Sequence, residues 1–300
     1  MWVLWLVEPI LALAALLSFL VGGWIRRRFR YPQLLRIVAV GGTAALLPAV
    51  LPSATGLTGP GTSVAAGILG LVLLGTLAVL LGTLRIASKP AAVRRRVLAV
   101  GAHPDDLELA CGGTLAKLVD SGHEVHMLVM SHGARGGDNA VRPLEAKRAG
   151  KLLGAASVTV FDFPDTRLNE QAAALVSAIE SAMVQVEPDI VLTHSGNDQH
   201  QDHNAVHLAT LRAARQHPAI LCYESPSATS DFRPSVFVGI DQYVEAKVAA
   251  VAAFRDQAGK PYMTAERIRG LASFRGAQAK ARFAEGYEPV RLLSSAVGDL

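Results

Sequence analysis

The chain has 300 residues, of which 51% are hydrophobic, and its formal net charge at pH 7 is +4. This apolar content is high for one soluble domain and indicates membrane-spanning segments. Residues 1–96 hold ten basic residues and one acidic residue, whereas residues 97–300 hold nineteen basic and twenty-four acidic residues. Because the folded part is acidic, the composition argues against nucleic-acid binding, which needs a basic face.

Three apolar stretches come first, at 2–25, 34–51 and 64–84. Each is close to the ~20 residues that cross a hydrocarbon core, so we predict a helical transmembrane region over 1–90. Glu8 and Pro9 interrupt the first stretch. A Gly-Gly pair and Pro48 interrupt the second, where a re-entrant or peripheral segment remains an alternative.

Basic residues flank these stretches on one side only. They lie at 26–30, with Arg36 just beyond, and again at 85–96, whereas the loop at 52–63 carries no charge. The positive-inside rule then predicts a multi-pass protein of the inner cell membrane, with the later domain in the cytoplasm. Residues 91–96, which contain three consecutive arginines, form a basic juxtamembrane linker.

Residues 97–300 are predicted to form one α/β domain. Short apolar runs alternate with segments whose apolar residues lie three or four positions apart, as in helices. The segment 241–285 is expected to be helical, with a break near 259–261. The expected strands are at 97–101, 125–130, 158–161, 190–193, 220–223 and 236–239. This alternation is typical of a mainly parallel sheet with flanking helices.

Polar residues cluster directly after four of the expected strands. A His-Pro-Asp-Asp motif at 103–106 follows the first strand, and a His-Gln-Asp-His motif at 200–203 follows the fourth and opens a helix. The loops at 131–142 and 162–167 follow the second and third strands. Because ligands of α/β folds bind at the carboxyl ends of the strands, these loops should converge on one site.

The two motifs together predict a metal site. His103 and Asp106 can point to one centre, and a residue of the second motif would complete a set of two histidines and one carboxylate. Three protein ligands plus water is the pattern of a catalytic zinc site. Asp105 and His200 would remain beside the metal, as a general base and as an acid or oxyanion stabiliser. His194 ends a strand at the same edge and is expected to line the pocket.

These motifs resemble the signature of the LmbE-like, or PIG-L, de-N-acetylases. The resemblance begins with the run from Ala102 to Leu115 and continues through motifs at 142–146, 163–165 and 200–203. It extends to the C-terminal tail and covers roughly residues 97–292. It implies a Rossmann-like fold and a hydrolase that uses one zinc ion to cleave acetamides of glucosamine-containing compounds.

Carried over by position, the family's zinc ligands match His103, Asp106 and His203. The general base would be Asp105. His200 would stabilise the oxyanion or act as the acid, with Asp202 orienting it and tuning its pKa. The positions that contact the acetyl group or the sugar match Arg142 and Asp165.

The sequence therefore predicts a membrane-anchored, zinc-dependent hydrolase of an N-acetylated amino sugar. Since apolar spans would confine the enzyme to the bilayer, we expect a substrate linked to a lipid or to a membrane-associated glycan. Two alternatives remain. The domain could be a non-catalytic sugar- or partner-binding module, although Asp105 and His200, needed only for turnover, are both present. It could also hydrolyse another small amide.

Overall fold

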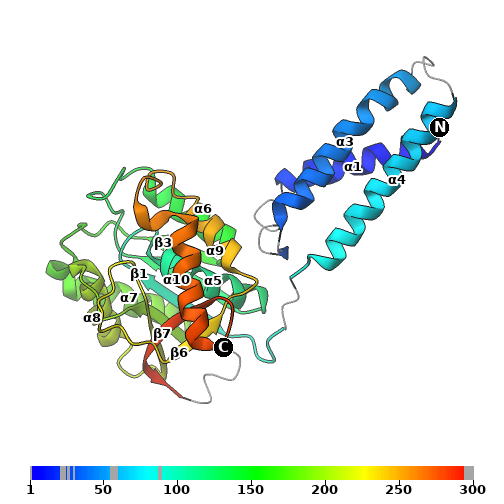
Figure 1. The fold of residues 1–300 in the computed structure, drawn as a ribbon. Helices are drawn as coiled ribbons and strands as arrows, with labels where there is room; N and C mark the ends of the chain where they lie inside the picture. Colours follow the sequence, from blue (N-terminus) through cyan, green and yellow to red (C-terminus); the bar gives the residue numbers. More distant parts are fainter. Residues whose placement is uncertain are drawn as a thin grey trace. The chain divides into compact units, whose positions relative to one another are not determined.

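The chain forms two units in the computed structural model, Met1–Ala87 and Ser88–Leu300 (Figure 1). The structure describes residues 2–20, 25, 28–29, 31–54, 60–86 and 90–293. Most of the basic cluster predicted at 26–30 lies outside the described residues, because Arg26, Arg27 and Arg30 are not among them.

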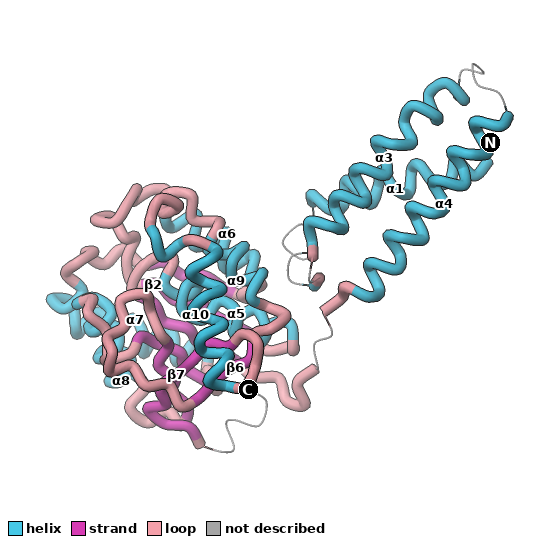
Figure 2. Tube along the Cα trace, viewed as in Figure 1, coloured by secondary structure: helices cyan, strands magenta, loops and turns pink. Residues whose placement is uncertain are grey.

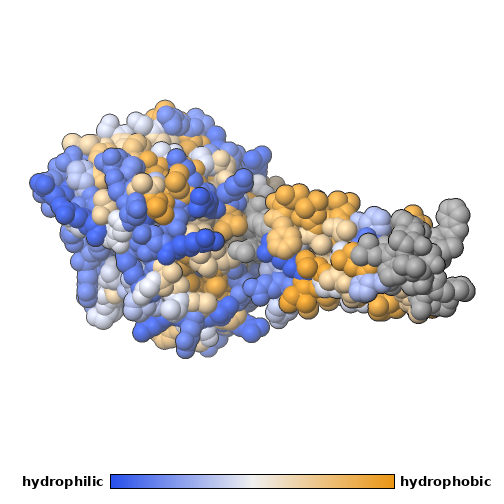
Figure 3. Space-filling model, turned by 90° about the horizontal axis from the view of Figure 1, so that it is seen from above, coloured by the Kyte–Doolittle hydropathy of each residue, from blue (hydrophilic) through white to orange (hydrophobic). Residues whose placement is uncertain are grey.

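The described residues of the first unit form the helices α1 (Trp2–Leu20), α3 (Pro32–Ala54) and α4 (Pro60–Thr83). They pack on one another around a small apolar core that includes Val7, Leu11, Leu46 and Leu77. Many other large apolar side chains point outward, and the following are more than half exposed: Leu6, Ile10, Phe19, Ile37, Ile68 and Val72. Figure 3 shows the apolar surface that these helices present.

Among the described residues, one helical segment, Val64–Thr83, is both long and apolar enough to cross a bilayer. The apolar segments of α1 and α3, Leu6–Leu20 and Pro32–Pro48, are shorter. The described part of α1 ends at Leu20, before the predicted end at 25, whereas α3 extends over the whole predicted second stretch, 34–51. By length and apolarity together, the prediction of three full spans is supported at one position only.

The second unit is built on a seven-stranded sheet with the order β3-β2-β1-β4-β5-β7-β6. The five strands from β3 to β5 are parallel, and β7 is antiparallel to both of its neighbours. All six predicted strands occur within one residue of the predicted ends, and β7 is an addition. The strands are β1 (Arg96–Gly101), β2 (Glu124–Val129), β3 (Ser157–Val160), β4 (Ile190–His194), β5 (Ala219–Tyr223), β6 (Val236–Gly239) and β7 (Ala284–Leu292).

Helices cover both faces of this sheet, which lies between them in Figure 2. The helices α5 (Asp106–Asp120), α6 (Arg142–Leu153) and α9 (Val244–Val251) pack together on one face, and α10 (Ala265–Ala279) packs on β6 and β7. On the other face, α7 (Ala172–Val186) and α8 (Gln201–Ala213) bury apolar side chains against Leu98 and Val100 of β1.

The strand order reverses between β1 and β4. From β1 the chain moves toward one edge of the sheet, through β2 to β3. From β4 it moves toward the opposite edge, through β5. This doubly wound order opens a crevice at the carboxyl ends of β1 and β4, where such folds bind their ligands. The two predicted motifs begin at these two strand ends.

A buried ion pair holds α5, the helix that follows β1. The helix is kinked at Cys111, and the N–H groups of Gly113 and Thr114 beyond the kink donate to the two oxygens of Glu285, at 3.0 and 2.7 Å. Lys247 of α9 pairs with the same carboxylate at 2.6 Å. The pair therefore ties α5 to β7 and α9.

Replacing Glu285 with alanine is expected to destabilise the protein by about 3 kcal/mol, because it leaves Lys247 buried without its counter-charge. The additional replacement Lys247→Met should recover part of this loss. Thermal unfolding of the full chain in detergent measures both effects. An unchanged unfolding temperature in Glu285→Ala would show that the pair does not stabilise the fold.

Candidate metal centre and active site

The first motif forms the turn between β1 and α5. Asp106 is the first residue of α5, and its Oδ2 atom accepts hydrogen bonds from the N–H groups of Ala102 at 3.0 Å and His103 at 2.7 Å. Its Oδ1 atom lies 3.3 Å from Nε2 of His203. Burial opposes ionisation of Asp106, but the nearby imidazoles of His203 and His194 outweigh it and hold the pKa well below its usual range.

Asp105 has a φ of 105°, in the left-handed region that residues other than glycine rarely adopt. Such strain persists only where the surrounding structure fixes it, and it is common at functional sites. The carboxylate is buried and lies 3.4 Å from Nη2 of Arg142. Burial, together with the charge of Asp106, raises the pKa of Asp105 to about 7. This value suits a general base that works near neutral pH.

Arg142 begins α6 and is fixed by backbone oxygens. Its Nη1 atom donates to the carbonyl of Gly133, and its Nη2 atom donates to the carbonyl of Pro104 at 2.8 Å. Gly133 has a φ of 71°, and a Cβ atom there would collide with the guanidinium. The glycine therefore lets the buried Arg142 lie beside Asp105.

His103 is surrounded by three carboxylates. Its Nε2 atom lies 3.0 Å from Asp202 Oδ2 and 3.1 Å from Asp165 Oδ1, and its Nδ1 atom lies 3.5 Å from Asp106 Oδ2. Burial opposes ionisation of Asp165, but its hydrogen bonds, first of all to His103, lower its pKa to about 2. Acidic partners on a metal-ligating histidine fix its ring and raise its basicity.

Asp202 contacts both His103 and His200, through different groups. Its carboxylate accepts hydrogen bonds from the N–H groups of Thr166 at 2.7 Å and Leu168 at 3.1 Å, besides its contact with His103. These two amides keep the carboxylate on the His103 side. Asp202 orients His200 through its own backbone N–H, which donates to His200 Nδ1 at 3.2 Å.

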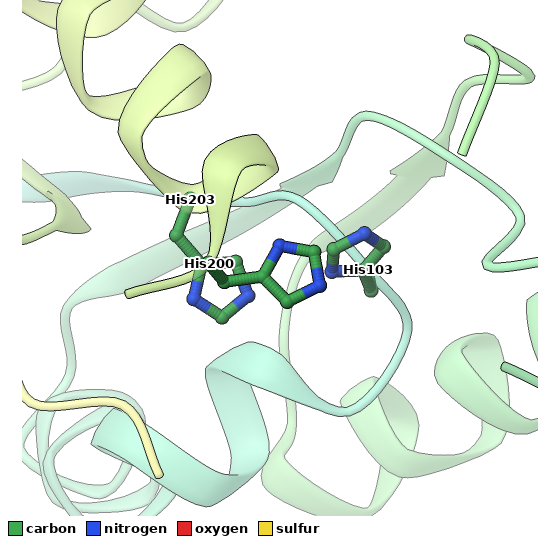
Figure 4. Close-up of side chains that lie close together, drawn as sticks. All are labelled: His103, His200 and His203. Carbon is green, nitrogen blue, oxygen red and sulfur yellow. The ribbon is translucent and has the colours of Figure 1, made fainter. Parts of the chain in front are cut away.

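His200 caps the N-terminus of α8 and is half-buried. Because Nδ1 accepts a hydrogen bond, the neutral ring carries its proton on Nε2 and can donate it. Burial, and then the charges of His203 and His103, lower the pKa of His200. Figure 4 shows the three rings gathered together, with His200 and His203 from the start of α8 and His103 from the loop after β1.

His194 does not line the pocket, contrary to the prediction. It ends β4 and is fully buried, and its Nε2 atom accepts a hydrogen bond from the N–H group of Ala102 at 3.1 Å. Its ring stacks on His203 with 3.9 Å between the ring centroids. His194 therefore packs behind a candidate ligand, since β4 turns this side chain into the core.

Among the residues that the structure describes, three overlapping sets of side chains could hold a metal ion. They are His103 with His200 and His203, Asp106 with His194 and His203, and His103 with Asp165 and Asp202. The predicted triad spans the first two sets. Its members fit a metal because His203 Nε2 is buried beside Asp106 Oδ1 and has no hydrogen-bond partner among the described residues. A divalent ion would satisfy both atoms.

Asp198, which the sequence did not single out, supports His203. Its Oδ2 atom lies 2.9 Å from His203 Nδ1 and also accepts the Ser225 hydroxyl, and its Oδ1 atom accepts the Ser227 hydroxyl at 2.7 Å. A carboxylate on the second nitrogen of a histidine directs the first nitrogen toward a metal. The only sequence signal for this role is an acid five residues before the histidine, in the loop that precedes α8.

Replacing Asp198 with alanine should weaken metal affinity by about 10–100-fold, because His203 loses the partner that fixes its tautomer and orientation. Competition with a chelator of known zinc affinity measures this change. Asp231→Ala, which removes an exposed acid, is the matched control and should bind zinc like the unmodified protein. Equal affinity in Asp198→Ala would show that the contact does not position the ligand.

A pocket of about 350 Å³ opens over these groups. Seven predicted residues lie in its wall: His103, Asp105, Asp106, Arg142, Asp165, His200 and His203. Arg135 also lines the pocket and lies in the predicted loop at 131–142, whereas Lys260 and Tyr262 line it and were not predicted. The site thus combines side chains that could hold a metal with a separate buried acid, in a pocket at the switch point of a doubly wound sheet. These features define an α/β metalloenzyme.

Comparison with known proteins identifies the family. Residues 98–214 match the sequence model of PIG-L, described as GlcNAc-PI de-N-acetylase. The uncharacterized deacetylase YaiS of Escherichia coli (strain K12) is 39% identical over 165 residues, which cover 53% of this chain and 89% of that protein. The chain thus belongs to the PIG-L family of metal-dependent de-N-acetylases.

Two further relatives differ in the reaction their names give. Diacetylchitobiose deacetylase of Thermococcus kodakarensis is 29% identical over 223 residues, which cover 64% of this chain and 82% of that protein. The crystal structure of GalB, the 4-carboxy-2-hydroxymuconate hydratase of Pseudomonas putida KT2440, superposes with a TM-score of 0.56 at 25% identity. This match covers 65% of this chain and 96% of that chain. The fold alone therefore does not fix the reaction.

Proposed function

We propose that this protein is a membrane-anchored, zinc-dependent hydrolase that removes the acetyl group from an N-acetylated amino sugar. The observation that carries the proposal is the buried Asp105 carboxylate, which lies beside a candidate metal set and shares its pocket. The family description and the diacetylchitobiose deacetylase support an amino-sugar acetamide as the substrate class.

His103, Asp106 and His203 would hold the zinc ion, since two imidazoles and one carboxylate are a donor set of catalytic zinc sites. The ion, when bound, polarises an acetamide carbonyl and lowers the pKa of water. Asp105 accepts the proton of the attacking water. Its carboxylate is held by Arg142 and lines the pocket, where it can reach that water. Its pKa of about 7 matches this task.

His200, which is neutral and carries its proton on Nε2, donates a hydrogen bond to the oxyanion that develops on the acetamide oxygen. The proton that Asp105 takes from water passes to the leaving amine, so that acetate and a free amine leave. Asp202 fixes His200 through its N–H group and His103 through its carboxylate. Arg142 and Asp165, both in the pocket wall, would contact the acetyl group or the sugar.

The test compares small acetamides at the same concentration. Zinc-loaded protein should release acetate from N-acetylhexosaminides faster than from acetyl-lysine or acetamide, because the pocket has room and polar groups for the sugar ring. Faster release from acetyl-lysine would assign the protein to another class of amide. Hydration of an unsaturated dicarboxylic acid without acetate release would instead assign it to the reaction of the hydratase relative.

Membrane anchoring through the first unit is supported by its surface. The apolar side chains of Val64–Thr83 are mostly exposed, unlike those of a core helix in a soluble protein. Exposed apolar surface of this extent is typical of membrane or protein contacts. The basic linker would then keep the second unit on the cytoplasmic side, close to a substrate carried by a lipid or a membrane-associated glycan.

We expect the full chain to stay in the membrane fraction after an alkaline carbonate wash. Val72→Arg places a charge in the middle of α4 and should release part of the protein, since such a charge costs about 3 kcal/mol in a bilayer. Val72→Leu is the matched control and should stay bound. A wild-type protein that the wash releases completely would contradict the anchor.

A further inference from the structure

Two cationic side chains of the pocket wall, Arg135 and Lys260, are not used by the proposed reaction. Arg135 is exposed and Lys260 is partly buried. Neither forms an ion pair with an acidic side chain in the part of the chain that the structure describes. A pocket that holds unpaired cations is suited to an anionic ligand.

Gly136 brings Lys260 next to Arg142. A Cβ atom on Gly136 would lie 2.9 Å from Arg142 Nη1 and 3.4 Å from Lys260 Nζ, so both nitrogens approach one point of this loop. Arg142 in turn contacts Asp105, and Lys260 also lies over the ring of Tyr262 at 5.9 Å from its centroid. Arg142 is therefore a neighbour of both the Lys260 ammonium group and Asp105, the candidate base.

The net charge of the pocket wall also favours an anionic ligand. Its formal charges balance, because three acids, Asp105, Asp106 and Asp165, face three cations, Arg135, Arg142 and Lys260. A divalent ion at the candidate metal centre would leave a net charge of +2. Since Arg142 is bonded to backbone oxygens and to Asp105, the free positive charge lies at Arg135 and Lys260.

We propose that Lys260 and Arg135 bind a phosphate group on the anomeric oxygen of the N-acetylhexosamine. This inference rests on the proposed function, which places the C2 acetamide at Asp105. The substituents on C1 and C3 flank that acetamide, and C1 is the one that carries the aglycone. A group on C1 would therefore lie next to the side chains that surround Asp105. Lysine and arginine bind phosphate oxygens through charge-assisted hydrogen bonds. A neutral aglycone would leave both cations without a partner.

The experiment crosses phosphate with an alkyl chain in four substrates of the full-length, zinc-loaded protein. They are methyl N-acetylglucosaminide, dodecyl N-acetylglucosaminide, N-acetylglucosamine 1-phosphate and its dodecyl phosphodiester. Phosphate should raise kcat/KM about tenfold in both the soluble and the alkyl pair. Lys260→Gln should remove most of this preference, while Lys147→Gln, at an exposed position of α6 outside the pocket wall, should keep it. The ratio of two substrates cancels any effect of Lys260 on Asp105 that both share.

Equal kcat/KM for the charged and neutral members of each pair, or a preference that Lys260→Gln retains, would overturn the proposal. A higher kcat/KM caused by the dodecyl chain alone would be an effect of the membrane anchor. A higher kcat/KM caused by phosphate in the soluble pair would be an effect of the pocket. If no acetamide is cleaved, the proposed function fails, and binding still tests the phosphate site. The Asp105→Asn protein should then bind N-acetylglucosamine 1-phosphate more tightly than it binds the methyl glycoside. Equal affinity for the two ligands would refute the phosphate site.

Discussion

Replacing Asp105 with asparagine is expected to lower the rate of acetate release by about 10²–10⁴-fold while the protein keeps its metal. An amide is nearly isosteric with the carboxylate but cannot accept the proton of the attacking water. Asp105 contacts Arg142, whereas Asp106 contacts the candidate ligands His103 and His203, so the change should spare the metal site. Acetate assays and elemental analysis of the same protein sample measure both properties.

Asp231→Asn, at an exposed position, controls for a generic loss of negative charge. If Asp105→Asn lost its metal while Asp106→Asn retained it, the roles of the two adjacent aspartates would have to be exchanged.

Replacing His203 with alanine is expected to remove the bound metal and to reduce acetate release to the background rate. Its Nε2 atom is the buried nitrogen that faces Asp106 without a hydrogen bond in the described structure, and no other side chain of α8 occupies that position. Metal content after dialysis, with activity measured on the same sample, tests this assignment. His126→Ala, on β2, removes an imidazole outside the pocket wall and should keep both metal and activity.

Metal retained in full by His203→Ala would contradict the predicted triad. Metal lost from His200→Ala but not from His203→Ala would instead favour the neighbouring set in which His200 is a ligand.

The parallel part of the fold could be predicted from sequence because each buried strand is a short apolar run. The last strand could not. β7 contains Gly286 and Pro289 and three charged side chains, so it shows no strand periodicity. Its first half pairs with β6 and its second half pairs with β5. Its pairing with β5 and β6 becomes visible only in three dimensions. The same limit explains why the segment 241–285 was expected to be helical up to its end.

The position of the site could be predicted because parallel strands end at one edge of the sheet. The directions of individual side chains could not. His194 turns into the core, and the Asp202 carboxylate is held by backbone amides of a distant loop. Asp198 and Lys260 have no motif around them. Lys260 reaches the pocket only because the segment after α9 folds over the loop at Gly136.

The central claim is tested most directly by measuring acetate and free amine together. Full-length protein in membranes or detergent would be assayed with an N-acetylglucosaminide before chelation, after chelation and after zinc is restored. We expect equimolar acetate and amine, their loss on chelation and their return with zinc. A zinc-loaded protein that releases no acetate from any N-acetylhexosaminide, or a release that chelation leaves unchanged, would contradict the account.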